Sequence, residues 1–214
     1  MNLTNAMQID VDGKRAVQVK IGGRVAWGLP DGYSPLDHIE TDGETQYLDT
    51  GFIPNQDSRI VCEFMYLGGN GIYGTRYSTS ARNFALRMIN SSWQPGYGAT
   101  LGSTGIASDK QWHVADQNRN VFYIDGELGR EFEYTTFTGP KPITLGGINA
   151  NNKFYYGEGC YRLCQIYDNG TMVRNMIPCT DPDGNAGMYD TVNDVFYGMV
   201  TVAVAAASID EDDF

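Results

Sequence analysis

The sequence predicts an all-β protein built around a β-sandwich, and three observations support this. Residues 111–126 contain two short β-type runs with a polar break between them, and end in the Asp125-Gly126 pair that tight hairpins favour. The 214 residues include 26 glycines, 14 tyrosines, 9 phenylalanines and 3 tryptophans, a mixture typical of many short strands joined by tight turns. Long stretches with helical periodicity are absent, so we expect little helix.

The hairpin within residues 111–126 is expected to lie in the middle of the sandwich. Trp112 and Val114 alternate with polar residues, which indicates a strand with one apolar face. The run 121–124 is apolar on both faces, as expected for a strand between two layers. We interpret residues 116–118 as the polar turn between the two arms.

Residues 1–32 predict a small β meander that precedes the sandwich. Short runs at 7–12, 16–21 and 24–27 are separated by glycine turns, and a Pro/Gly-rich joint follows at 28–35. Three strands this short bury little apolar surface on their own. We therefore expect this segment to pack on the sandwich or to anchor the protein to a larger assembly.

The sandwich itself is assigned to residues 33–207. The sequence Asp168-Asn169-Gly170 between apolar runs is the strongest hairpin signal in the chain. Residues 91–98 have the composition of a loop, the apolar run 200–207 is compatible with a last strand, and 208–214 are expected to be a mobile acidic tail. The other strands are expected at 59–67, 72–75, 83–89, 131–137, 142–145, 161–168, 171–177, 185–190 and 194–198.

These motifs resemble a known fold family. The segment Trp112-His113-Val114, the strand ending in 123–126, and then residues 143–147, 156–157 and 160–167 are similar to the central hairpin and following strands of laminin-G-like, concanavalin A-like jelly rolls. The resemblance covers residues 33–200 and implies a concanavalin A-like jelly-roll sandwich. Because the motifs are structural, they indicate the fold better than the function.

The N-terminal part of the chain has a resemblance of its own. Residues 12–33, and then 36–55, resemble the start of bacteriophage tail-associated and virion accessory proteins; related domains occur in surface proteins of gut bacteria. The resemblance implies a protein made in the host cytoplasm and displayed on the virion surface, either a capsid-decoration or a tail subunit. It also implies contact with other virion proteins through the N-terminal segment, and is compatible with a homo-oligomer.

Charge and hydropathy narrow the range of partners. The net charge of −11 disfavours nucleic-acid binding, because the chain should repel phosphates. No apolar run reaches about 18 residues, so membrane insertion is not expected. Residues 1–8 lack the pattern of a signal peptide.

The cysteines are expected to be buried thiols, as in a protein made in the cytosol. A single Cys-x-x-x-Cys pattern without a histidine nearby in the sequence does not predict a zinc site, so we assign no metal ligands. The four cysteines are Cys62, Cys160, Cys164 and Cys179.

The sequence offers little support for catalysis. His38 and His113 are the only histidines that a nucleophile could use as a base, and both fall in expected strands. Glu131 and Glu133 are two residues apart, like the carboxylates of some glycan hydrolases, but fit solvent-facing positions of a short strand. We therefore expect no enzymatic activity.

One loop has a sequence pattern that is compatible with calcium binding, and we expect no other cofactor. Asp181, Asp183 and Asn185 are spaced two residues apart around a glycine, as in loops that bind hard cations. The pattern lacks the downstream bidentate glutamate of an EF-hand, and such sequences also form ordinary tight turns without metal.

A carbohydrate-binding face is the best functional hypothesis from the sequence. Sugars stack their apolar faces on aromatic rings while polar side chains bind the hydroxyl groups. Trp93 and Tyr97 flank Pro95-Gly96 and are predicted as stacking platforms, with Arg82, Asn83 and Tyr77 as polar neighbours. Tyr73 and Arg76 are nearby in the sequence. The alternative is that these aromatic residues anchor the loops in the core.

Two classes of function therefore remain. One is a lectin-like module that binds host or mucosal glycans from the virion surface. The other is a purely structural subunit whose sandwich covers and stabilises the particle. An exposed aromatic groove favours the first class, whereas a large apolar protein interface favours the second.

Overall fold

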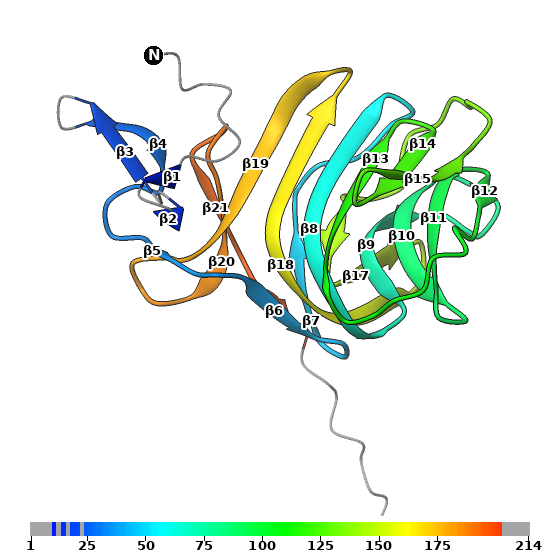
Figure 1. Ribbon diagram of the computed structural model, residues 1–214, viewed down its shortest axis with the longest axis horizontal. Coiled ribbons are helices and arrows are strands. Elements are labelled where there is room, and N and C mark those ends of the chain that lie inside the picture. Colours follow the sequence, from blue (N-terminus) through cyan, green and yellow to red (C-terminus); the bar gives the residue numbers. More distant parts are fainter. Residues whose placement is uncertain (1–9, 12–13, 16–17, 22–23, 203–214) are drawn as a thin grey trace, which may run out of the picture.

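The computed structural model describes residues 10–11, 14–15, 18–21 and 24–202, and across these residues the protein is all-β with no helix. Figure 1 shows two layers of curved strands around a common core. The all-β fold class predicted from composition and alternation is confirmed. Within the described ranges, no helix is long and apolar enough to cross a membrane.

The first layer is built on the pairing of β8 with β18. Its strand order is β15–β14–β13–β8–β18–β19–β20–β21, antiparallel throughout. The short strands β5 and β6 pair with β19 and β18. The bounds are β5 Ser34–Pro35, β6 Ile39–Asp42, β8 Ser58–Gly69, β13 Trp112–Asn118, β14 Val121–Ile124, β15 Glu127–Glu131, β18 Phe154–Asp168, β19 Thr171–Thr180, β20 Ala186–Asp190 and β21 Val195–Gly198.

The second layer centres on β9 and β10. Its order begins β12–β11–β10–β9, and β9 pairs further with β16 in antiparallel and with β17 in parallel orientation. The start of β18 pairs with β17, so this long strand joins the two layers. The bounds are β7 Gln46–Asp49, β9 Gly71–Arg76, β10 Asn83–Ile89, β11 Ser92–Gly98, β12 Thr100–Leu101, β16 Thr144–Leu145, β17 Gly147–Ala150 and β22 Val200–Thr201.

The N-terminal segment forms two separate two-stranded pairs rather than one three-stranded meander. Strand β1 (Asp10–Val11) pairs with β2 (Lys14–Arg15), and β3 (Gln18–Ile21) pairs with β4 (Arg24–Gly28). Its role as an anchor stays a prediction. At the other end, β22 pairs with β7, while residues 203–207 and the expected acidic tail lie outside the described residues.

The central hairpin is present, but its turn lies later than expected. The strand β13 continues through Asn118, and Arg119 takes the positive φ of the turn before β14. Residues 116–118 are not a polar break, because Asp116 forms an ion pair with Arg59 on β8, and Gln117 points into the core. The turn predicted at Asn169-Gly170 joins β18 to β19, as expected.

Two further strand predictions are wrong. The segment 91–98, predicted as a loop, contains β11, which pairs with β10 along its whole length. The strand predicted at 131–137 ends at Glu131 in β15. Beyond it, Phe132 and Phe137 are buried against Tyr97, so these residues are held by side-chain packing instead of a strand ladder.

Side chains from both layers meet in one core. The Phe64 ring on β8 packs edge-on against Trp93 on β11, with 5.3 Å between ring centroids. The Tyr161 hydroxyl on β18 donates to the carbonyl of Ile72 on β9 at 2.8 Å and accepts from the amide of Gly146. Such contacts satisfy the buried polar groups while they hold the layers together.

The backbones of β18 and β9 approach each other closely at Gly157. A Cβ added to Gly157 would lie 1.7 Å from the carbonyl oxygen of Gly71. We expect Gly157→Ala to lower the free energy of unfolding by about 1–3 kcal/mol, because backbone atoms must move to admit the methyl group. The measurement is a urea unfolding curve with a matched control, Gly198→Ala, whose nearest atom is Phe196 Cε1 at 3.5 Å. Equal losses in the two variants would contradict this close approach.

Candidate functional site

The aromatic residues predicted as sugar platforms lie in the core, so their predicted exposure is wrong. Trp93 is 0% exposed and Tyr97 is 1% exposed. Both point inward because alternate residues of β11 face the first layer. The Tyr97 hydroxyl donates to the carbonyl of Gln56 at 3.1 Å. In this conformation neither ring can stack on a ligand, and both act as the core anchors of the alternative interpretation.

The structure also separates the polar residues of that predicted site. Asn83 is buried, and its side-chain amide donates to the carbonyl of Gly98 at 3.0 Å, which is a structural role. Tyr77 and Arg82 lie together at the surface, with the guanidinium 4.4 Å from the ring centroid. Their role in binding stays a prediction. Tyr73 and Arg76 are buried, so they cannot join the exposed pair.

A groove lies at the end of the molecule where β8 turns into β9 and β10 turns into β11, at the opposite end of the β9–β10 hairpin from the loop that contains Tyr77 and Arg82. We call it the turn groove. It has a volume of about 580 Å³. Three segments distant in the sequence contribute to it, namely residues 66–70, 88–91 and 108–110. It is lined by Tyr66, Gly69, Asn70, Met88, Ile89, Asn90, Ser91, Ser108 and Lys110.

The turn groove combines one aromatic ring with polar groups that have no intramolecular partner. The half-buried Tyr66 ring packs against Trp93, and its hydroxyl donates to the carbonyl of Gly69 at 2.6 Å. Among the described residues, no side-chain hydrogen bond or ion pair involves the remaining polar side chains. These are Asn70, Asn90, Ser91, Ser108 and Lys110.

Backbone geometry fixes the rim of the turn groove. Asn90 and Ser91 have φ values of 50° and 60°, as in the two-residue turns that match the twist of a hairpin. Lys110, on the opposite segment, has a φ of 59°. The two segments are joined by a backbone hydrogen bond from Ser108 to Ser91. The groove therefore has a defined shape, although its polar side chains are exposed or half-buried.

The first histidine lies in a cluster that the sequence did not predict. His38 Nδ1 is 3.0 Å from Asp37 Oδ2, and His38 Nε2 is 2.9 Å from Glu40 Oε1. Cys160 pairs directly with Glu40 across the β6–β18 ladder, and Arg162 donates to Asp37 at 2.8 Å. We call these five residues the His38 cluster.

Charges within the His38 cluster shift its pKa values. Burial lowers the pKa of His38, but the hydrogen bonds to Asp37 and Glu40 outweigh it, so the net shift is upward. Arg162 and then His38 lower the pKa of the Asp37 carboxyl. Burial, followed by the charge of Glu40, raises the pKa of the Cys160 thiol. The cluster thus favours the charged form of the imidazole, which lies between two carboxylates, and the neutral form of the thiol.

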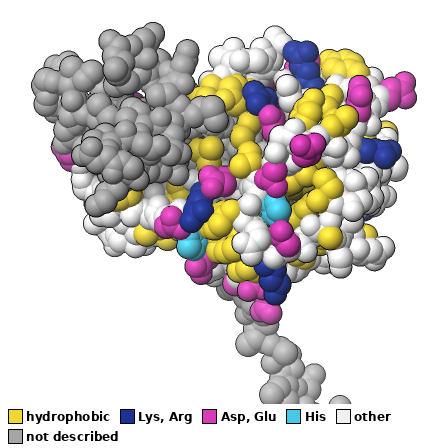
Figure 2. All heavy atoms as spheres, viewed as in Figure 1, with side chains coloured by type: hydrophobic (Ala, Val, Ile, Leu, Met, Phe, Trp, Pro, Cys, Tyr) yellow, Lys and Arg dark blue, Asp and Glu magenta, His cyan; other side chains and the backbone are white. Residues whose placement is uncertain are grey.

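The second histidine has a similar arrangement but no thiol. His113 Nδ1 is 2.7 Å from Asp125 and its Nε2 is 2.9 Å from Asp109. Burial lowers the pKa of His113, but the hydrogen bonds to Asp125 and Asp109 raise it by more. Figure 2 shows histidine side chains among acidic and hydrophobic ones on one face of the molecule. Both nitrogens of each ring already face carboxylates, so neither is placed against a hydroxyl nucleophile.

The loop predicted as a possible calcium site closes on itself. Asp181 Oδ1 accepts hydrogen bonds from the amides of Asp183 at 3.0 Å and Asn185 at 2.8 Å. Its other oxygen accepts from the Asn185 side chain, and this bond is the main reason why the pKa of Asp181 is lowered. These bonds explain the acidic spacing as a turn, and calcium binding there stays an untested hypothesis.

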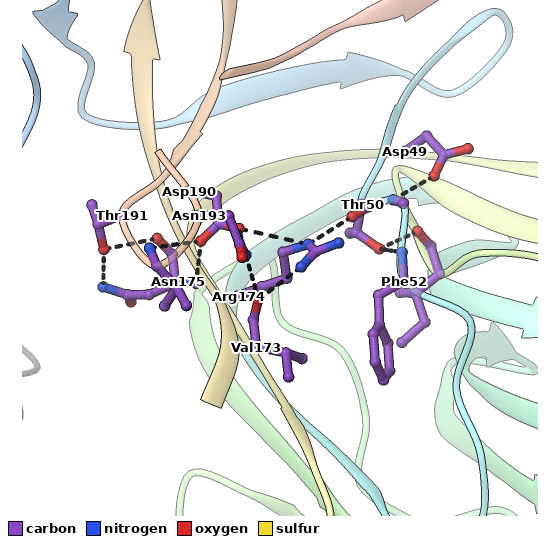
Figure 3. A network of polar contacts seen from close by, with 12 residues as sticks. Asp49, Thr50, Phe52, Val173, Arg174, Asn175, Asp190, Thr191 and Asn193 are labelled. Atoms are coloured by element: carbon purple, nitrogen blue, oxygen red, sulfur yellow. Dashed lines mark hydrogen bonds and ion pairs between the residues drawn. The ribbon is translucent and has the colours of Figure 1, made fainter. Parts of the chain in front are cut away.

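A further polar network, shown in Figure 3, is structural. The Asp190 carboxylate is fully buried and accepts hydrogen bonds from the amides of Asn175 and Val192 and from the side chain of Asn193. The Arg174 side chain lies 3.6 Å from Asp190 and donates to the carbonyl of Thr50. The network connects β19 and the β20–β21 turn to the segment after β7.

The four cysteines are buried free thiols, as the sequence predicted. Cys62 and Cys164 face each other across the β8–β18 ladder inside the core.

No protein-family model matches the chain, and no curated protein matches its sequence.

The burial of Trp93 predicts that the protein loses stability when this ring is removed. We expect Trp93→Ala to lower the free energy of unfolding by about 3–5 kcal/mol, the usual range for removing a large buried ring. The control Tyr77→Ala removes a ring that is 45% exposed and should change stability by less than about 0.5 kcal/mol. Urea unfolding followed by circular dichroism gives both values. Similar small losses in both variants would mean that Trp93 is not a core residue.

The raised pKa of His113 predicts that the stability of the protein depends on pH. Its pKa is raised in the folded protein, so its stabilising contribution is complete below the unfolded value of about 6.5 and is lost as pH rises through the folded pKa. The difference in unfolding free energy between wild type and His113→Gln should therefore shrink as pH rises from about 6.5 into the alkaline range. A difference that stays constant across this range would show that the two ion pairs do not stabilise the fold.

Proposed function

We propose that this protein is a non-enzymatic, lectin-like module that binds glycans through the turn groove and is displayed on the surface of a bacteriophage virion. The finer fold assignment, a concanavalin A-like jelly roll, is part of the proposal. It is supported by the two-layered, mainly antiparallel arrangement and by the motif resemblance within residues 33–200.

The observation that carries the proposal is the composition of the turn groove. A saccharide needs an apolar surface for its C–H face and hydrogen-bonding groups for its hydroxyls. Tyr66 supplies the first, and the second comes from five polar side chains that form no side-chain hydrogen bond or ion pair with the other described residues. With a volume of about 580 Å³, the groove lies within the usual range for small-molecule sites.

Binding at this groove is expected to be weak for one copy. A single stacking ring contributes on the order of 1 kcal/mol, and the polar side chains at the rim lose conformational freedom on binding. Display of many copies on one particle would raise the overall avidity without any new contact. Attachment through residues 1–32 is part of this proposal.

The absence of an activated nucleophile among the histidine clusters supports a binding function. Each imidazole is held between two carboxylates, an arrangement that fixes the ring and raises its pKa. A purely structural subunit of the particle is the competing proposal. The structural proposal gives no role to the polar side chains of the turn groove, which form no side-chain hydrogen bonds with other described residues.

A binding assay separates these proposals. The full chain, coupled in many copies to beads, is applied to an array of mucin-type O-glycans and bacterial surface polysaccharides. We expect wild type to bind a subset, and Tyr66→Ala to reduce that signal about tenfold, since 1.4 kcal/mol corresponds to a factor of ten. The matched control is Tyr134→Ala, which removes another tyrosine, 50% exposed and outside the groove.

Thermal unfolding of both variants is measured in parallel, so that a loss of binding is not confused with a loss of fold. Signals that fall equally in Tyr66→Ala and Tyr134→Ala would contradict binding in the turn groove. No signal from wild type on the array would favour the structural subunit.

A further inference from the structure

Three side chains that can bind a transition metal lie together in the His38 cluster. One ligand atom each from His38, Glu40 and Cys160 lies within 4.8 Å of the others. The strand register brings two of them together, because Cys160 is directly opposite Glu40, and His38 immediately precedes β6, two residues before Glu40. Their neighbours Ile39 and Tyr161 point into the core, so the three side chains share the other face.

We propose that His38, Glu40 and Cys160 form a zinc site. Imidazole nitrogen, thiolate sulfur and carboxylate oxygen are the three kinds of ligand that Zn²⁺ takes in proteins, at about 2.0–2.3 Å. His38 Nε2 and Glu40 Oε1 are already 2.9 Å apart, so small side-chain rotations bring both to one ion. Three protein ligands leave the fourth tetrahedral position to water.

The hydrogen bonds of His38 resemble those of metal-binding histidines. Its Nδ1 faces the Asp37 carboxylate, which fixes the ring so that Nε2 is directed to Glu40. Zinc-binding histidines commonly make such a bond with their second nitrogen. Asp37 is held in turn by Arg162, whose guanidinium stacks on Trp112 at 3.8 Å from the ring centroid. These contacts of Asp37 and Arg162 already hold the His38 ring in position, and no rearrangement of the structure is needed.

The surroundings of His113 differ from those of His38, although both histidines lie between two carboxylates. The carboxylates beside His113 are those of Asp109 and Asp125. Among the residues that the structure describes, however, only the His38 cluster brings three ligand atoms this close together. A histidine between two acidic groups is thus not sufficient, and the thiol of Cys160 distinguishes the two places.

The site is tested on the full chain after dialysis against a chelator, with zinc and cobalt(II) as the probes. We expect one saturable zinc site by calorimetry, and a cobalt–thiolate absorption band in the near ultraviolet. Both should be lost in Cys160→Ser and in His38→Gln. Asp37→Asn should weaken zinc binding about 10- to 100-fold, as is usual for a partner of a metal-bound histidine. His113→Gln is the matched control and should bind zinc like wild type.

Thermal unfolding gives a second readout. Zinc should raise the Tm of wild type and of His113→Gln, but not that of His38→Gln, because a ligand stabilises only the state that binds it. Absence of saturable binding by wild type would overturn the proposal, as would a cobalt–thiolate band that survives in Cys160→Ser. If Cys160→Ser fails to fold, the half-buried His38→Gln variant decides the question alone. Glycan binding is not required for any of these results.

Discussion

Burial of the Trp93 indole between the two layers is the constraint on which the rest of the structure depends. The ring packs against Phe64 at 5.3 Å and Tyr66 at 5.6 Å, both on β8. Its Nε1–H has no acceptor among the described residues, a cost of about 1–3 kcal/mol. Packing of a ring this large contributes about 3–5 kcal/mol, so burial prevails. With β11 fixed against β8 in this way, the β10–β11 and β8–β9 turns lie side by side and form the turn groove.

The sequence predicts the all-β class and the turns at Asp125-Gly126 and Asn169-Gly170 well, because alternation and Gly-containing turns act locally. It fails at β11, where Pro95-Gly96 has the composition of a loop although Trp93, Pro95 and Tyr97 alternate as in a strand. Local sequence does not reveal which face of a strand is covered, and for this reason buried rings were predicted as exposed platforms.

The two candidate sites could not be predicted for a related reason. The turn groove combines three segments whose residues are ordinary in composition, and they meet through the pairing of β9 with β10 and of β8 with β13. His38 and Cys160 are far apart in the sequence, and they meet because β6 pairs with β18. Sites of this kind depend on strand order, which periodicity alone does not determine.

Fluorescence measures whether Trp93 is buried in the folded core, as its role in fixing the turn groove requires. With Trp27 and Trp112 replaced by phenylalanine, Trp93 is the only remaining tryptophan. The account predicts blue-shifted emission that acrylamide quenches weakly, and a shift to the red with strong quenching only after unfolding in urea. Emission from the folded protein that resembles free tryptophan and is strongly quenched would contradict it.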